Sequence, residues 1–147
     1  MKSNRKEHIL VTGGAGFIGS HLVDKLLSEN YKVTVLDNLS NGKIENLIQA
    51  KSNPNFKFIK GDILQIKNCL MASQRTKYIF HLACLGIRHS IHNPFDNHRV
   101  NAEGTLNMLM AALENKVSHF FYISSSEIYG NTDTFPITEK TLPQPTT

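Results

Sequence analysis

The sequence predicts an α/β fold, a doubly wound parallel sheet with helices on both faces. Two observations carry this prediction, and a third bounds the number of domains. Short apolar runs alternate with helical patterns along the whole chain, which is typical of strand–helix–strand units. A glycine-rich segment follows the first of these runs. The 147 residues, 40% of them hydrophobic, suffice for one hydrophobic core and not for two, so we expect one domain over residues 1–147.

Five apolar runs are the candidate strands. Their near-continuous hydrophobic character suits parallel strands that are buried on both faces. About five strands joined by four crossovers therefore make up the expected sheet. The predicted strands cover residues 9–12, 32–36, 56–59, 78–82 and 120–124.

The segments between these runs carry the spacing of amphipathic helices. In the first of them Ile18, Leu22 and Leu26 recur at helical spacing. The longest is predicted to begin near Asn93 and Pro94, because asparagine caps helices and proline suits the first turn. The predicted helices cover residues 17–30, 43–51, 66–73 and a stretch from 93 through 113, and the Thr- and Pro-rich residues 138–147 are predicted to be coil.

Charge and cysteine content exclude several function classes. The net charge of +4 comes partly from a basic cluster at the amino end, and no basic stripe follows, so we expect no nucleic-acid partner. Cys69 and Cys84 stand in no metal-binding spacing, so neither a zinc site nor a disulfide framework is expected. No segment resembles a signal peptide or a membrane span. We therefore expect a cytoplasmic protein with no membrane partner and no metal.

Gly13, Gly16 and Gly19 form a GxxGxxG motif that closes the first strand and opens the first helix. Gly13 permits the tight turn, Gly16 lets the backbone approach a pyrophosphate, and Gly19 allows close packing of helix and strand. This context is typical of the dinucleotide-binding Rossmann fold. The adjoining Phe17 and Ile18 complete the predicted cofactor-binding loop.

Asp37 ends the second strand about eighteen residues after the glycine motif, where a carboxylate accepts hydrogen bonds from the adenosine ribose. Its charge would repel a 2′-phosphate, and no arginine follows directly to bind one. NAD is therefore the expected cofactor rather than NADP, with Asp37 and Asn38 among its binding residues. The plainer alternative is a solvated aspartate at a strand end.

Six segments, in one order over nearly the whole chain, carry a resemblance to a known family. The chain resembles the extended short-chain dehydrogenase/reductases, specifically the NAD-dependent nucleotide-sugar epimerases and dehydratases. The resemblance implies transient oxidation of a sugar hydroxyl and return of the hydride, a nucleotide-sugar substrate, and a homodimer when full length. The segments are TGGAGFIGSHLVDKLL (12–27), VLDNLSNG (35–42), GDI (61–63), HLA (81–83), NAEGTLNML (101–109) and YISSSEIYG (122–130).

The resemblance also implies further cofactor-binding residues. Asp62 and Ile63 would lie against the adenine. Leu82 and Ala83 would place their backbone next to the nicotinamide. Asn101 would be a polar support beneath the site. Plainer roles stay open at two positions, because Asp62 could simply cap a turn and Asn101 could tie a helix to a strand.

Three basic side chains near these segments are given structural roles. His81 is interpreted as a satisfied core imidazole rather than a catalyst. Arg88 and His89 are interpreted as facing solvent or forming a lid over the cofactor, and the alternative is that they face a sugar phosphate.

Ser125, Ser126 and Glu127 follow the fifth predicted strand, and strand carboxyl ends are where doubly wound sheets place ligands. In the family pattern Ser125 matches the catalytic Ser/Thr that hydrogen-bonds the sugar oxygen being oxidised. Ser126 and Glu127 match a pair whose carboxylate moves a proton at the carbon beside the transient ketone. An acid in a first helical turn is the plainer role of Glu127. Epimerase, dehydratase and decarboxylase chemistry all stay open.

The family's Tyr-x-x-x-Lys is absent, since Tyr122 is followed by Ser126 and Tyr129 by Asp133. We therefore expect this chain to be the amino-terminal part of a longer enzyme, with the remaining strands and the substrate domain missing. The chain as given should bind NAD but should not turn over a nucleotide sugar. A non-catalytic dinucleotide-binding module is the alternative, and an NADP-linked reductase is a third possibility.

Overall fold

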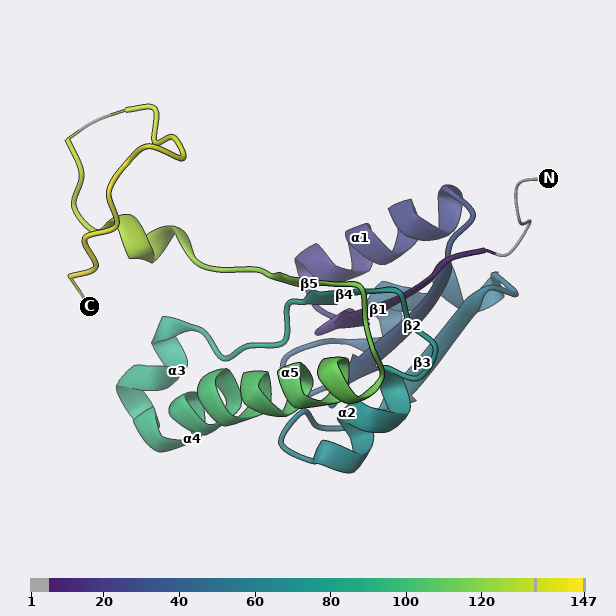
Figure 1. Ribbon diagram of the computed structural model, residues 1–147. Coiled ribbons are helices and arrows are strands. Elements are labelled where there is room, and N and C mark those ends of the chain that lie inside the picture. The colour runs from purple at the N-terminus through teal and green to yellow at the C-terminus, as the bar shows by residue number, and fades with distance from the viewer. Residues whose placement is uncertain (1–5, 134, 147) are drawn as a thin grey trace.

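The computed structural model describes residues 6–133 and 135–146 and centres on a five-stranded parallel sheet. The spatial order of the strands is β3-β2-β1-β4-β5 (Figure 1). Every predicted strand is therefore confirmed, with small shifts at the ends. The strands are β1 (His8–Thr12), β2 (Lys32–Asp37), β3 (Phe56–Lys60), β4 (Tyr78–His81) and β5 (His119–Tyr122).

Helices cover both faces of this sheet, with α1 on one side and α2 and α5 on the other (Figure 1). The doubly wound fold is thereby confirmed. The α-helices are α1 (Phe17–Ser28), α2 (Ile66–Ala72), α3 (Ile87–His92), α4 (Pro94–His98) and α5 (Thr105–Glu114); η3 (Arg99–Gly104) is π-helical, and η1 (Ile44–Leu47), η2 (Ala50–Ser52) and η4 (Ser126–Tyr129) are 3₁₀ turns. Among the helices of the described residues, none has both the length and the apolar character needed to cross a bilayer.

Two apolar layers hold the helices to the sheet. Val11 and Val35 belong to the layer that packs against Val23 of α1. Leu10, next to Val11 on β1, belongs to the opposite layer with Met108 of α5. Because successive side chains of a strand point to opposite faces, a strand covered on both sides must be apolar throughout. This requirement explains the unbroken apolar runs of the inner strands.

The helix predicted over residues 43–51 is wrong, and η1 and η2 occupy this segment instead. The Lys43 backbone N–H and the Asn46 side-chain amide both donate to the Ala15 carbonyl, at 3.0 and 2.8 Å. Leu47 is fully buried in the layer that contains α1. These contacts with the glycine loop outweigh the local helical preference, which is a weak determinant in a short segment.

The long helix begins where the sequence predicts, since the Asn93 side chain accepts a hydrogen bond from the Asp96 backbone N–H. It runs as one helical stretch through α4, η3 and α5 to Glu114. Its middle is widened into a π-helical turn, which the sequence did not predict. The preceding residues, which lie outside the predicted helices, form the additional short helix α3.

The last strand, β5, forms one edge of the sheet and pairs with β4 alone. The His119 and Ile123 backbone N–H groups donate to carbonyls on the β4 side, so alternation directs those of Phe120 and Tyr122 to the outer side. Phe121 and Tyr122 are exposed, so burial of this run on both faces is a wrong expectation. Within the described part of the chain, no strand pairs with this edge.

Candidate functional site

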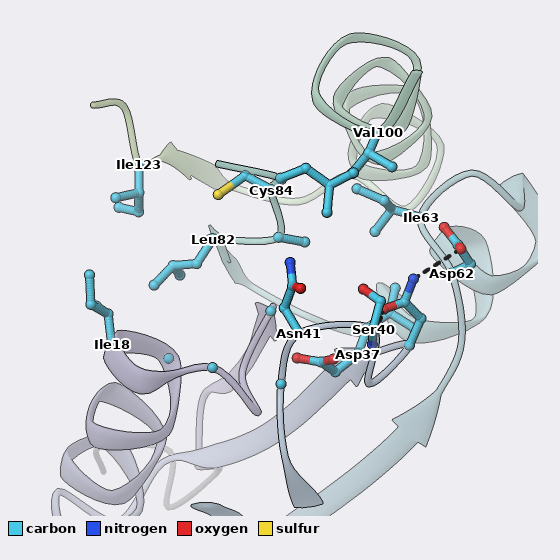
Figure 2. A pocket seen from close by; sticks show the side chains of 18 of the residues that line it. Ile18, Asp37, Ser40, Asn41, Asp62, Ile63, Leu82, Cys84, Val100 and Ile123 are labelled. Carbon is cyan, nitrogen blue, oxygen red and sulfur yellow. Dashed lines mark hydrogen bonds between the residues drawn. The ribbon is translucent and has the colours of Figure 1, made fainter. Parts of the chain in front are cut away.

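A cavity of about 730 Å³ lies at the carboxyl ends of β1, β2 and β4 (Figure 2). The chain proceeds from β1 to β2 and β3 on one side, then returns to place β4 on the other side of β1. Such a reversal is the position at which doubly wound sheets bind ligands. The lining comprises the glycine loop, segments that follow β2, β3 and β4, the side chains of His89, Asp96 and Val100, and residues 123 and 124.

The glycine loop brings backbone into close contact at two points. Gly13 has a φ of +67°, and a side-chain carbon there would lie 2.7 Å from the Ala83 backbone nitrogen. A side-chain carbon at Gly19 would overlap the Gly13 carbonyl oxygen. Helix α1 begins at Phe17, so its first backbone N–H groups have no partner within the helix and can bind an anion. Gly13, Gly16, Phe17, Ile18 and Gly19, the residues predicted to bind the cofactor, all line the cavity.

Asp37 is fixed at the end of β2 by two backbone N–H groups. Ala15 donates to its Oδ2 at 2.9 Å and Leu39 donates to its Oδ1 at 2.8 Å. The side chain is only 7% exposed and lies on the cavity wall. An ionised carboxylate has about four acceptor positions, so each oxygen keeps capacity for another donor. The geometry suits a ligand that offers two neighbouring hydroxyl groups.

Asn38 and Asp62 join the segments that follow β2 and β3. The Asn38 amide donates to Asp62 Oδ2 at 3.0 Å, while Asp62 Oδ1 accepts from the Leu64 backbone N–H at 2.8 Å (Figure 2). Asp62 therefore has the turn-capping role expected as the plainer alternative and also lines the cavity. Beside it Ile63, only 5% exposed, gives this end of the cavity an apolar surface.

Leu82 and Ala83 line the opposite wall, whereas Asn101 is absent from this lining and lines the adjoining second cavity. The Asn101 side-chain oxygen accepts from the Leu85 backbone N–H, and its amide donates to the Leu85 carbonyl, both at 2.8 Å. The Asn97 amide also donates to that carbonyl at 2.9 Å. These bonds tie the segment after β4 to the helical stretch.

His81 joins the ends of β1 and β4 to α5 through a directed series of hydrogen bonds. Thr105 gives its hydroxyl hydrogen to the Asn101 carbonyl, at 2.7 Å, so it accepts from His81 Nε2 at 3.1 Å. His81 Nδ1 then accepts from the Thr12 hydroxyl at 2.7 Å, whose oxygen accepts from the Ala83 backbone N–H at 3.2 Å. The imidazole is 1% exposed, so it is a satisfied core group as interpreted from the sequence.

A second cavity of about 410 Å³ adjoins the first and shares Cys84, Leu85, Ile123 and Ser124 with it. Ser125 and Glu127 both line the second cavity, where the Ser125 hydroxyl oxygen accepts from the Glu127 backbone N–H at 3.2 Å. Ser126, predicted beside them, begins the η4 turn and is not among the lining residues. Two of the three predicted catalytic residues thus share one cavity next to the predicted cofactor site.

Several lining residues were not predicted from the sequence, Cys84 and Val100 among them, and one was left undecided. Cys84 lies where the two cavities meet, and burial raises the pKa of its thiol. Val100 comes from the unpredicted π-helical turn. His89 lines the first cavity while Arg88 does not. On sequence alone these two residues have the same expected role, and the structure shows that their positions differ. Only the position of Cys84, directly after the HLA segment, offered a signal beforehand.

No group of three His, Cys, Asp or Glu side chains within the described residues could hold a metal ion. The polar groups that line the two cavities are backbone donors, carboxylates, amides, hydroxyls, the Cys84 thiol and the His89 imidazole.

Burial lowers the pKa of His81 from its ordinary value of 6.5 to about 4, and this shift makes stability depend on pH. Between these values the unfolded chain binds a proton that the folded chain excludes. The free energy of unfolding should therefore fall by about 3 kcal/mol as pH drops from 6.5 to 4. Urea titrations over this range should show a shallower fall for His81→Gln. The exposed His92→Gln serves as control, and an unchanged slope in His81→Gln would contradict the assignment.

Comparison with known proteins gives a consistent result. The family described as GDP-mannose 4,6 dehydratase matches residues 10–147. UDP-glucuronic acid decarboxylase 1 of Arabidopsis thaliana is 42% identical over 129 residues, which cover 86% of this chain and 28% of the relative. UDP-glucose 4-epimerase of Mycolicibacterium smegmatis is 39% identical over 133 residues, 88% of this chain and 42% of the relative.

Two solved structures resemble the whole fold. A UDP-N-acetylglucosamine 4-epimerase from Methanobrevibacter ruminantium has a TM-score of 0.86 at 34% identity, over 97% of this chain and 45% of its own. A dTDP-glucose 4,6-dehydratase from Streptomyces venezuelae, solved with NAD bound, has a TM-score of 0.86 at 33% identity. This match covers 94% of this chain and 45% of the dehydratase chain. The chain thus spans less than half the length of these relatives. It belongs to the extended short-chain dehydrogenase/reductases, in the family of nucleotide-sugar epimerases and dehydratases.

Proposed function

We propose that this chain is the NAD-binding part of an enzyme that oxidises a nucleotide-sugar hydroxyl transiently and then returns the hydride. The observation that carries this proposal is Asp37, a buried carboxylate at a strand end whose spare acceptor positions border a large cavity beside the glycine loop. Family membership supports the substrate class.

The residues present fit a dinucleotide. The backbone approach at Gly13 and the N-terminus of α1 suit a pyrophosphate, and Asp37 suits the adenosine ribose. Ile63 and Asp62 offer an apolar surface and an acceptor for the adenine. When bound, NAD supplies the hydride acceptor and donor, which the side chains of the described residues do not provide.

The second cavity is the proposed substrate side. There the Ser125 hydroxyl would donate to the sugar oxygen that is oxidised and stabilise its developing negative charge. Glu127 would move a proton at the carbon beside the transient ketone, in those reactions of the family that include this step. Its presence separates epimerisation, dehydration and decarboxylation only weakly. Ser126 would take part only through the η4 turn that orients these two residues.

A non-catalytic dinucleotide-binding module is the second candidate. It is favoured by one observation: none of the four tyrosines in these 147 residues has a lysine four positions later. Both candidates require dinucleotide binding, and conversion of a nucleotide sugar by an intact longer chain would exclude the second.

Cofactor choice tests the role of Asp37. NAD should bind more tightly than NADP in calorimetric titrations, because the carboxylate accepts from ribose hydroxyls and repels a 2′-phosphate. Asp37→Ala should weaken NAD binding about tenfold or more, as expected for loss of charge-assisted hydrogen bonds, and should narrow the difference between the cofactors. The exposed Asp133→Ala should change neither affinity. Equal or tighter NADP binding by the unmutated chain would contradict the proposal.

Turnover tests the proposed division of labour. The 147-residue chain with NAD should not convert UDP-glucose, UDP-glucuronate or GDP-mannose, because no Tyr-x-x-x-Lys is present to accept the hydroxyl proton. Chromatography of the sugar nucleotides after prolonged incubation would measure this. Any product formed in proportion to the amount of chain would show that another group performs the proton transfer.

A homodimer of the full-length protein is proposed as well, and α5 offers a surface for it. Leu106, Leu109, Met110 and Leu113 are exposed and share one face of the helix by their spacing. A two-fold interface brings the same patch of both subunits together, and this apolar face would pack against its own copy. Sedimentation equilibrium of the full-length protein should show a dimer that Leu113→Glu dissociates, with Leu142→Glu on the exposed tail as control. A dimer that persists in Leu113→Glu would argue against this face.

A further inference from the structure

Gly104 is a glycine that its own backbone conformation does not require. It joins η3 to α5 with φ −61° and ψ −41°, ordinary helical values that any residue adopts. Glycine inside a helix is less stable than alanine, because its backbone loses more conformational freedom on folding. The neighbouring residues supply a separate reason for glycine at this position.

The space above Gly104 is filled by Ile63. A side-chain carbon at Gly104 would lie 2.5 Å from Ile63 Cδ1 and 2.7 Å from its Cγ1, but 3.6 Å from its Cβ. The first two distances are severe overlaps, and the third is an ordinary contact. The two outer carbons of Ile63 thus occupy the room that the missing side chain leaves.

Ile63 cannot retreat by moving its backbone. Its carbonyl accepts hydrogen bonds from the Asn107 amide at 2.9 Å and from the Cys69 thiol at 3.3 Å. Its side chain is branched at Cβ, so it has few favourable rotamers. On its open side the side chain borders the large cavity, near Val100 and Asp62 (Figure 2). A side chain introduced at position 104 would therefore displace the Ile63 side chain toward the cavity.

We propose that Gly104 is a positioning residue for the adenine end of the cavity: it admits the Ile63 side chain against the helix and so keeps the adenine space open. This inference rests on the proposed dinucleotide function. It means that Gly104, which does not line the cavity, influences the affinity for the dinucleotide. Gly104 touches neither ligand nor reacting atoms in this role.

The test is calorimetric titration of the chain with AMP and with NAD. Gly104→Ala should raise the dissociation constant for both by about tenfold, the equivalent of about 1.4 kcal/mol and within the usual cost of overpacking. The affinities for AMP and NAD should fall by the same factor, because the displaced Ile63 side chain meets only the adenosine half that the two ligands share.

Two substitutions of Ile63 supply the matched controls. Ile63→Ala removes both overlapping carbons, so adding Gly104→Ala in that background should change AMP affinity little. Ile63→Val loses Cδ1 but keeps the carbon at the Cγ1 position, so the same addition should still weaken binding, though less than in the unmutated chain. Thermal unfolding of each variant verifies folding. Should Gly104→Ala alone not fold, the double variant with Ile63→Ala still folds and binds AMP as Ile63→Ala does.

The outcomes separate the two proposals. An unmutated chain that binds neither AMP nor NAD would refute the proposed function. Two results would overturn only the role of Gly104, provided that the unmutated chain binds both ligands. In the first, Gly104→Ala binds AMP and NAD as tightly as the unmutated chain. In the second, Gly104→Ala lowers AMP affinity equally whether residue 63 is Ile, Val or Ala. A loss for NAD much larger than that for AMP would overturn it too, since the effect would then extend beyond the adenosine half.

Discussion

The contact between the ends of β1 and β4 is the constraint on which the rest of the site depends. At Gly13 the backbone turns with positive φ and lies directly against the Ala83 backbone, leaving no room for a side chain. This contact sets the distance between the glycine loop and the segment after β4, which are two walls of the large cavity. It also brings Thr12 within hydrogen-bonding distance of His81 and of the Ala83 N–H.

From this contact a buried polar path extends into the helical stretch. His81 connects Thr12 to Thr105, and Thr105 connects to the Asn101 carbonyl. Every group on the path has a partner, which is the condition under which a buried polar network stabilises one arrangement instead of destabilising the core. The π-helical turn is the point where the path ends, where Asn101 holds Leu85, and where Gly104 admits Ile63. One irregular turn of helix thus supports two separate walls of the cavity.

Local pattern and turn chemistry were sufficient to predict the strands, the glycine loop and Asp37. Burial on both faces requires unbroken apolar runs, and the strand–loop–helix context restricts where glycines and an acid can stand. The two 3₁₀ turns at 44–52 and the lining role of Val100 could not be predicted, because contacts with residues distant in sequence determine them. Asn101 shows the intermediate case. Its importance was predicted, but the partner it binds, the Leu85 backbone, emerges only in three dimensions.

The walls of the two cavities rest on strands that differ in their pairing. The glycine loop and Asp37 lie at the ends of β1 and β2, each paired on both sides, whereas Asp62 and Ile63 follow β3, and Ser124 and Ser125 follow β5. Within the described residues, β3 and β5 are each paired on one side only. Strands at an edge open at lower free energy than central ones. Local opening of this sheet should therefore begin at β3 or β5, and disturb the Ile63 end of the large cavity or the second cavity, while the glycine loop and Asp37 keep their geometry.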